Sequence, residues 1–255
     1  MSRTFPQPTA LLLLALSLLP LSGTASADAG RYVRQPAVHG DTVVFTAEGD
    51  LWTGTVAGGV PRRLTTHAGD ESRAAIDPAG RQVAFSASYD GPLEAYVMPL
   101  AGGAPRRLSF EYGRALVVGW TPAGEVLYAT ASASGQTWSS VLVAVDPDSL
   151  ARRTLPVADA GDGVVDPSGR WLYFVRFGLG ATNDNAVGYR GGALSQLWRL
   201  DLAGDAEARR IGPADANLRQ PQWWNGRLVV VADLDGRDNL WTLDAEGGDP
   251  RPLTA

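Results

Sequence analysis

The chain has 255 residues, no cysteine, a formal charge of −5 and 45% apolar residues. Without cysteine it can form no disulfide, no cysteine-ligated zinc site and no thiol nucleophile, and its acidic balance disfavours nucleic acid as a partner. Its 30 glycines and 17 prolines predict many turns and few long helices.

Residues 1–27 have the pattern of a signal peptide. Arg3 precedes an apolar run over residues 10–21, which is shorter than the roughly 20 residues of a membrane-spanning helix. Ala25 and Ala27 fit a signal-peptidase site, so we predict cleavage after Ala27 and export to the periplasm or the cell exterior. The alternative is an uncleaved N-terminal anchor. After cleavage we expect no membrane association.

A repeated unit organises residues 28–255, which we expect to form one domain. In one copy the turn Asp77-Pro78-Ala79-Gly80 precedes two short apolar strands. The sequence Arg106-Arg107-Leu108 follows these strands. Five copies cover residues 33–72, 73–116, 117–161, 162–218 and 219–255. Four short strands in about 40 to 45 residues are typical of one propeller blade. The sequence therefore predicts an all-β fold, a β-propeller of four-stranded antiparallel blades.

Recurring residues in the units have structural explanations. Asp-Pro-x-Gly favours a tight turn, because proline sets φ and glycine accepts positive φ. The paired arginines fall on the fourth, outermost strand, where charge discourages edge pairing; anion binding is the alternative. We interpret the aromatic residues at equivalent third-strand positions as blade-to-blade packing, with ligand stacking as the alternative. They are Trp52, Tyr96, Trp198 and Trp241.

The number of blades is the open question of the fold. The first unit has its own innermost strand, so no strand is left over to join the two ends of a ring. Either five blades close by packing alone, or they are part of a six-bladed propeller in a longer chain. We expect the longer chain, because no capping segment follows the fifth unit.

The residues do not predict a catalytic site. Only His39 and His67 could act as imidazole bases, and no Gly-x-Ser-x-Gly segment accompanies them. Asp233, Asp235 and Asp238 superficially resemble a calcium loop, but they lack its order and its terminal glutamate. We interpret these aspartates as a solvated hairpin tip and expect no catalytic residue, cofactor or metal in this chain.

The fourth unit contains surplus length over residues 178–194. Long loops in compact domains are often functional. Within this insertion, Tyr189 and Arg190 are our candidate peptide-binding residues, by stacking and by a charge-assisted hydrogen bond to a C-terminal carboxylate. The alternative is a packing loop between domains or subunits.

The repeat from Asp-Pro-x-Gly to Gly-Gly-x-Pro-Arg-Arg-Leu resembles that of TolB-like propellers. Residues 32–52, 188–202 and 220–241 more specifically resemble the N-terminal propeller of tricorn-type serine peptidases, as an exported bacterial homologue. The resemblance implies a six-bladed propeller that passes or filters peptides, followed by a second propeller, a PDZ domain and a catalytic region. None of the family's catalytic serine, histidine and glutamate residues has a counterpart here.

Two functions follow as expectations. The first is a non-catalytic propeller that gates or docks oligopeptides for a catalytic domain absent from this chain. The alternative is a TolB-like periplasmic protein–protein interaction propeller with no enzymatic role. Whether the protein is an enzyme stays open, because the family is one of hydrolases while this chain lacks catalytic residues. Expected partners are oligopeptides or a protein, further domains of the same polypeptide, and optionally a second copy.

Overall fold

The computed structural model describes residues 32–134, 139–177, 191–192 and 194–254. The signal peptide predicted over residues 1–27 lies outside this part of the chain. The described residues contain strands and turns but no helix, and hence no helix that could cross a membrane.

Twenty strands form five antiparallel sheets, each with its four strands in chain order. Blade 1 contains β1 (Arg34–His39), β2 (Thr42–Ala47), β3 (Asp50–Thr55) and β4 (Arg62–Arg63). Blade 2 contains β5 (Glu71–Ile76), β6 (Gln82–Ala87), β7 (Glu94–Pro99) and β8 (Arg106–Arg107). Blade 3 contains β9 (Ala115–Trp120), β10 (Val126–Thr130), β11 (Val141–Val145) and β12 (Arg152–Thr154). Blade 4 contains β13 (Ala160–Val165), β14 (Trp171–Arg176), β15 (Gln196–Asp201) and β16 (Arg209–Arg210). Blade 5 contains β17 (Leu218–Trp224), β18 (Arg227–Ala232), β19 (Asn239–Leu243) and β20 (Arg251–Pro252).

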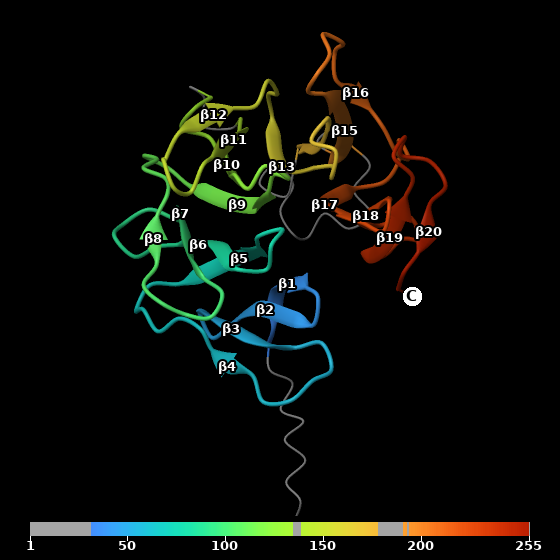
Figure 1. Cartoon of the computed structure of the whole chain (residues 1–255). Helices are drawn as coiled ribbons and strands as arrows, with labels where there is room; N and C mark the ends of the chain where they lie inside the picture. Colours follow the sequence, from blue (N-terminus) through green and yellow to red (C-terminus); the bar gives the residue numbers. More distant parts are fainter. Residues whose placement is uncertain (1–31, 135–138, 178–190, 193, 255) are drawn as a thin grey trace, which may run out of the picture. The chain divides into compact units, whose positions relative to one another are not determined.

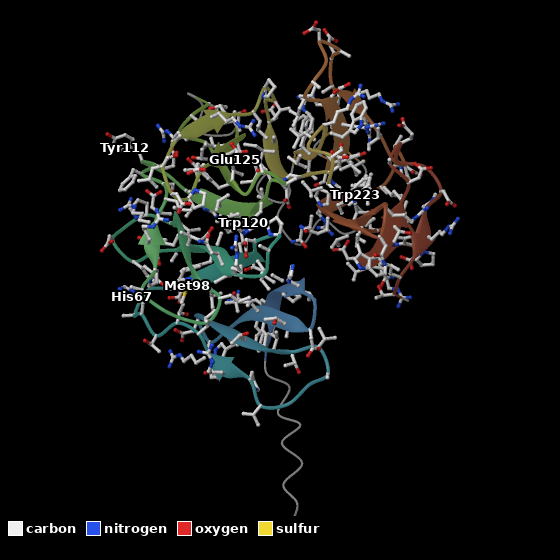
Figure 2. All side chains as sticks on the ribbon, in the orientation of Figure 1. His67, Met98, Tyr112, Trp120, Glu125 and Trp223 are labelled. Carbon is white, nitrogen blue, oxygen red and sulfur yellow. The ribbon has the colours of Figure 1, made fainter. Side chains whose placement is uncertain are left out.

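The blades are arranged in a ring, with the first strand of each blade innermost (Figure 1). Successive innermost strands contact one another, β1 with β5, β5 with β9, β9 with β13 and β13 with β17. In one of these contacts, the Trp120 indole N–H donates to the carbonyl of Ala75 at 2.9 Å, joining blade 3 to blade 2 (Figure 2). The predicted propeller of four-stranded blades is confirmed.

The Asp-Pro-x-Gly turns form as the sequence predicts. In blade 2 the amide of Gly80, at φ +68°, donates to the carbonyl of Asp77 at 2.9 Å. The Asp77 carboxylate then accepts the backbone N–H of Gln82 at 2.6 Å. Asp166 repeats both contacts in blade 4, with Gly169 at 2.9 Å and Trp171 at 2.8 Å. Each aspartate therefore holds the start of the second strand in its blade.

The apolar core lies between neighbouring blades, because a single sheet cannot bury both of its own faces. One pair recurs in every blade, in which a residue after the fourth strand donates its N–H to the carbonyl of a third-strand residue. The pairs are Leu64–Leu51, Leu108–Ala95, Leu155–Leu142, Ile211–Leu197 and Leu253–Leu240. The first four pairs are at most 9% exposed, whereas Leu240 and Leu253 are 41% and 46% exposed.

The two ends of the ring are less covered than its interior. Strand β1 is exposed at all but one of its residues, unlike the other innermost strands. Strands β17 and β1 make no contact of the extent seen between successive blades. Blade 1 therefore has one face without a preceding blade, and blade 5 has one face without a following blade, among the described residues.

The third-strand aromatics pack between blades, as predicted, wherever a preceding blade exists. Tyr96 lies against blade 1, Trp198 against blade 3 and Trp241 against blade 4. Trp52, in blade 1, is half-buried, and its indole N–H donates to the carbonyl of Ala47 at 3.1 Å.

In two of the arginine pairs, the second arginine forms an ion pair with a buried carboxylate. Arg107 donates to the buried carboxylate of Glu94 at 2.7 Å, and Arg63 forms the equivalent ion pair with buried Asp50. In both blades the outermost strand is thus tied to the start of the third strand.

Candidate functional site

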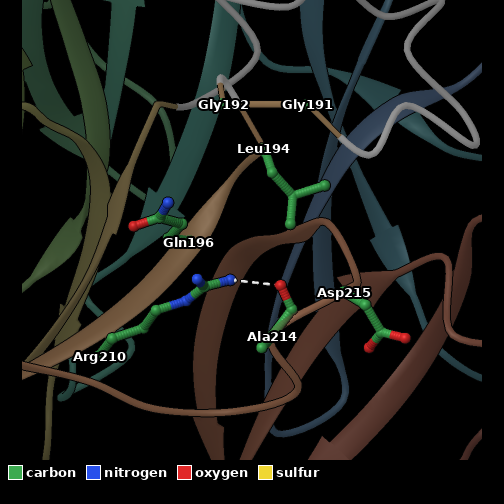
Figure 3. Close-up of a pocket in the computed structure, with 7 residues that line it drawn as sticks. All are labelled: Gly191, Gly192, Leu194, Gln196, Arg210, Ala214 and Asp215. Carbon is green, nitrogen blue, oxygen red and sulfur yellow. Dashed lines mark hydrogen bonds between the residues drawn. The ribbon is translucent and has the colours of Figure 1, made fainter.

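A pocket of about 470 Å³ lies on blade 4, and the described residues at the end of the insertion line part of it (Figure 3). Its walls come from residues before β15, from β15 and β16, and from the loop that leads to β17. The lining residues are Gly191, Gly192, Leu194, Gln196, Arg210, Ala214 and Asp215. Its volume falls within the range of roughly 300 to 1,000 Å³ that small-ligand sites occupy.

Arg210 is the central polar side chain of this pocket. Its Nη2 donates to the carbonyl of Ala214 at 2.7 Å, so the guanidinium is held against the loop (Figure 3). Its Nε is buried and makes no hydrogen bond within the described part of the chain. Gln196 lies on the same side of the pocket as Arg210 (Figure 3), and its side-chain oxygen accepts the indole N–H of Trp198 at 3.1 Å. Leu194 supplies a buried apolar wall and Asp215 an exposed carboxylate.

A buried polar chain fixes the pocket loop. Asp233 is fully buried and accepts both the backbone N–H and the side-chain amide of Asn217, at 2.8 and 2.9 Å. The Asn217 oxygen accepts the backbone N–H of Ser195 at 3.1 Å, just before β15. Gly212 gives the loop its sharp start, because a Cβ there would lie 2.6 Å from Leu218 at a φ of +79°.

The prediction that Asp233, Asp235 and Asp238 form a solvated hairpin tip is wrong for Asp233. Its carboxylate anchors Asn217 in the interior. Asp235 and Asp238 are exposed, as predicted; Asp238 forms an ion pair with buried Arg219, and Asp235 accepts the Asn239 amide at 3.0 Å. Within the described residues no group of three or more histidine, cysteine or acidic side chains could hold a metal ion.

The predicted peptide-binding residues Tyr189 and Arg190 lie outside the described residues. In the sequence they directly precede Gly191, which lines the pocket. Arg210 was missed as a site residue, because by sequence it is one more member of the repeated arginine pairs. The one sequence signal for Arg210 as a site residue was that Arg209-Arg210 is the first arginine pair after the insertion.

The two histidines are far from a catalytic arrangement. The Nε2 atom of His39 lies 3.2 Å from the carbonyl oxygen of Pro78, in the turn of blade 2. His67 lies at the outer rim (Figure 2), where its ring contacts that of Tyr89 in a tilted arrangement, with a centroid distance of 4.0 Å and an interplanar angle of 45°. Its Nδ1 accepts the N–H of Gly69 at 2.9 Å. Neither ring has a hydrogen bond to a serine or threonine hydroxyl among the described residues.

The neighbouring carboxyl of Glu71 is structural. It accepts the hydroxyl groups of Tyr89 and Thr65, at 2.6 and 2.9 Å. Burial raises its pKa, and the two hydroxyl donors partly offset that effect. These contacts join blade 1 to blade 2 and leave the carboxyl without access to a substrate.

The fold is a β-propeller whose blade 4 contains a pocket, and neither described histidine hydrogen-bonds to a serine or threonine hydroxyl of the described residues. The model of the tricorn protease N-terminal β-propeller domain matches residues 30–255, and the chain belongs to that family.

Individual relatives agree with this assignment. Tricorn protease homolog 1 of Streptomyces coelicolor is 31% identical over 238 residues, which are 91% of this chain and 22% of the relative. A crystal structure of the tricorn protease superimposes with a TM-score of 0.75 at 21% identity, covering 88% of this chain and 22% of that one. A TolB-type protein from Agrobacterium tumefaciens gives 0.71 at 21% identity, covering 88% and 81%. The chain thus spans about a fifth of the curated tricorn relatives.

Proposed function

We propose that this chain is the non-catalytic propeller of a tricorn-like serine peptidase, where it docks or gates oligopeptides for a catalytic domain beyond these residues. The observation that carries the proposal is the blade 4 pocket on a propeller of this family. Neither described histidine hydrogen-bonds to a serine or threonine hydroxyl of the described residues, so the nucleophile–base pair of a serine peptidase is not formed among them. The role left to this region is binding.

The pocket chemistry suits the end of a peptide. Arg210 supplies charge-assisted donors for a carbonyl or a terminal carboxylate, and Gln196 supplies an amide. Leu194 offers apolar contact to a side chain. Tyr189 and Arg190, which precede the pocket in sequence, remain our candidates for its outer contacts.

Fluorescence anisotropy with labelled, unstructured decapeptides tests the proposal. We expect residues 1–255 to bind these peptides. Arg210→Ala should weaken binding about tenfold, since hydrogen bonds to charged groups contribute roughly 1.5 to 3 kcal/mol. Arg251→Ala is the matched control, because Arg251 also lies on an outermost strand but is 66% exposed and pairs only with Asp249 among the described residues. Wild-type affinity in Arg210→Ala would exclude the pocket, and absence of peptide binding would exclude the proposed role.

We also propose that a sixth blade, supplied by the full-length protein, covers the open faces of blades 1 and 5. The exposed pair Leu240–Leu253 supports this, because its four counterparts are buried beneath a following blade. Hydrogen exchange at the amides of β19 in a longer version of the protein tests it. Protection should rise relative to residues 1–255 alone, and equal exchange would contradict the proposal.

The second candidate is a TolB-like protein-interaction propeller. It is favoured by the TolB-type structure, of which this chain covers 81%. Under this alternative the chain binds a protein partner and does not bind short peptides, so the anisotropy experiment separates the two functions.

Export and cleavage after Ala27 remain proposals, tested by cell fractionation and N-terminal sequencing of the mature protein.

A further inference from the structure

The linker between blades 2 and 3, residues 108–114, exposes two aromatic side chains. Phe110 is 64% exposed and Tyr112 is fully exposed. Figure 2 shows Tyr112 at the outer edge of the ring. The polar residues next to them, Ser109 and Glu111, are buried. Polar residues inside and large aromatic residues outside are the reverse of the usual order, and such an inversion marks a candidate interaction surface.

Hydrogen bonds hold the linker in this inverted arrangement. The Ser109 hydroxyl accepts the backbone N–H of Ala95 at 2.8 Å and donates to the buried carboxylate of Glu94. The backbone N–H of Glu111 donates to the same carboxylate at 2.8 Å, and the Glu111 carboxylate accepts the hydroxyl of Tyr128 at 3.0 Å. The backbone is thus fixed on both sides of the first aromatic residue, so its exposure is a property of the fold.

The equivalent linker between blades 1 and 2, residues 64–70, forms without aromatic residues at these positions. Its Thr65 makes the same kind of contacts as Ser109, accepting a backbone N–H at 2.8 Å and donating to a buried carboxylate at 2.9 Å. Exposed Thr66 and Ala68 occupy the two positions that are aromatic in the next linker. The connection between blades therefore does not require aromatic side chains there.

Guanidinium groups surround the two aromatic residues. Arg107 lies over the ring of Phe110, 4.6 Å from its centroid. Arg152 donates to the Glu111 carboxylate at 3.2 Å, while 60% of the arginine side chain stays exposed. Arg114 is exposed and forms no ion pair with another described residue. The carboxylates that pair with the first two arginines are buried, so these contacts leave positive charge towards water.

We propose that Phe110 and Tyr112, together with Arg107, Arg114 and Arg152, form a rim patch that docks a short acidic segment of a separate partner protein. The rim patch lies on a different blade junction from the blade 4 pocket. The inference does not depend on the peptide docking proposed for that pocket.

The chemistry of the rim patch selects this occupant. Carboxylates accept charge-assisted hydrogen bonds from guanidinium groups, and apolar side chains of the same segment can pack on the two rings. Arginine and tyrosine are also among the residues that contribute most at protein interfaces. A permanent domain interface is larger and more hydrophobic than two rings among arginines, so the rim patch suits a short, reversible contact. A long polyanion such as nucleic acid would also meet the rest of this chain, whose formal charge is −5.

The exposure of Tyr112 makes the rim patch testable without unfolding the protein. The probe is a labelled decapeptide of alternating aspartate and leucine, and its binding to residues 1–255 is measured by fluorescence anisotropy. The double variant Phe110→Ser and Tyr112→Ser should keep its Tm and bind the probe at least about tenfold more weakly. Trp224→Ser is the matched control, because Trp224 is another exposed aromatic residue, on β17 of blade 5, and it should leave the affinity unchanged.

A second measurement tests the charge of the partner. The same decapeptide with lysine in place of aspartate should bind at least about tenfold more weakly, and added salt should weaken binding of the acidic probe. Arg114→Glu should weaken the acidic probe and strengthen the lysine version. Equal binding of the two peptides, wild-type affinity in the double serine variant, or no binding of the acidic probe by the wild type would each overturn the rim patch.

Three further outcomes identify a different occupant or site. Loss of probe binding in Arg210→Ala, with wild-type affinity in the double serine variant, would place the acidic peptide in the blade 4 pocket and overturn the rim patch. Tighter binding of a single-stranded oligonucleotide than of the acidic probe, lost in the double serine variant, would replace the protein partner with nucleic acid. Loss of probe binding in a longer version of the protein would show that another domain of the same polypeptide covers the rim patch, which contradicts a separate partner.

Discussion

Leu253 donates its backbone N–H to the carbonyl of Leu240 at 2.8 Å, yet both side chains are nearly half exposed. The same pair in blade 4, Ile211 and Leu197, makes the same hydrogen bond at 2.9 Å and is buried. Local geometry is therefore independent of whether another blade covers the pair. The hydrophobic contribution of the pair should depend on that cover.

Truncating equivalent leucines should give unequal losses. Leu197→Ala should lower the free energy of unfolding by about 2 to 5 kcal/mol, because Leu197 is fully buried. Leu240→Ala should lower it by about 1 kcal/mol or less, because water already reaches that side chain. Denaturant unfolding of residues 1–255 measures both. Equal losses would show that the face of blade 5 is covered in solution, as in a self-associated form.

The turn of blade 2 depends on His39 from blade 1. A Cβ on Gly80 would lie 2.7 Å from Nδ1 and Cε1 of His39, whereas a Cβ on Gly124, the equivalent glycine of blade 3, meets nothing within 4 Å. Both glycines have positive φ, +68° and +85°, so each alanine substitution carries a backbone cost of about 1 to 2 kcal/mol. Gly80→Ala should destabilise the protein more than Gly124→Ala.

Thermal unfolding of both alanine variants, with and without His39→Ala, isolates the contact. His39→Ala should recover part of the loss in Gly80→Ala and none of the loss in Gly124→Ala. Equal losses in the two single variants would mean that the His39 ring moves aside without cost.

The sequence predicts the blades because each repeat carries its own local information. Asp77, Pro78 and Gly80 encode their turn within four residues, and the third-strand residue Tyr96 recurs one unit after Trp52. The site is less predictable because its parts are not local. Arg210 differs from other paired arginines only through the loop it meets in space.

Other features depend on contacts between distant strands. The buried state of Asp233 depends on Asn217, which lies before a different strand of blade 5. The bulge at Gln35 follows from the register with β2. Periodicity alone contains no signal for either.

The stability of the protein should respond to pH through Asp162. Its pKa in the folded protein is about 6, raised from 3.8 chiefly by desolvation. Between about pH 4 and pH 6 the folded protein therefore binds more protons at this carboxyl than the unfolded chain does. Its contribution to stability is fully present below about pH 4 and is lost as pH rises towards 6.

Asp162→Asn should remove this component, so its Tm should vary less than that of the wild type between pH 4 and pH 6. Melting curves across that interval, with both proteins in the same buffers, measure the difference. Equal changes in Tm for the two proteins across this interval would contradict the raised pKa of Asp162. A wild-type Tm that rises relative to that of Asp162→Asn as the pH increases would contradict it as well.

The amide of Asn217 should contribute more to stability than a similar exposed amide nearby. Asn217 donates to fully buried Asp233 at 2.9 Å, and Asn239 donates to exposed Asp235 at 3.0 Å. Asn217→Ala leaves a buried carboxylate short of a donor and should lower the free energy of unfolding by about 2 to 3 kcal/mol. Asn239→Ala should lower it by only about 0.5 kcal/mol, because water replaces the lost bond. Urea unfolding of the two variants makes the comparison, and similar losses would show that water reaches Asp233.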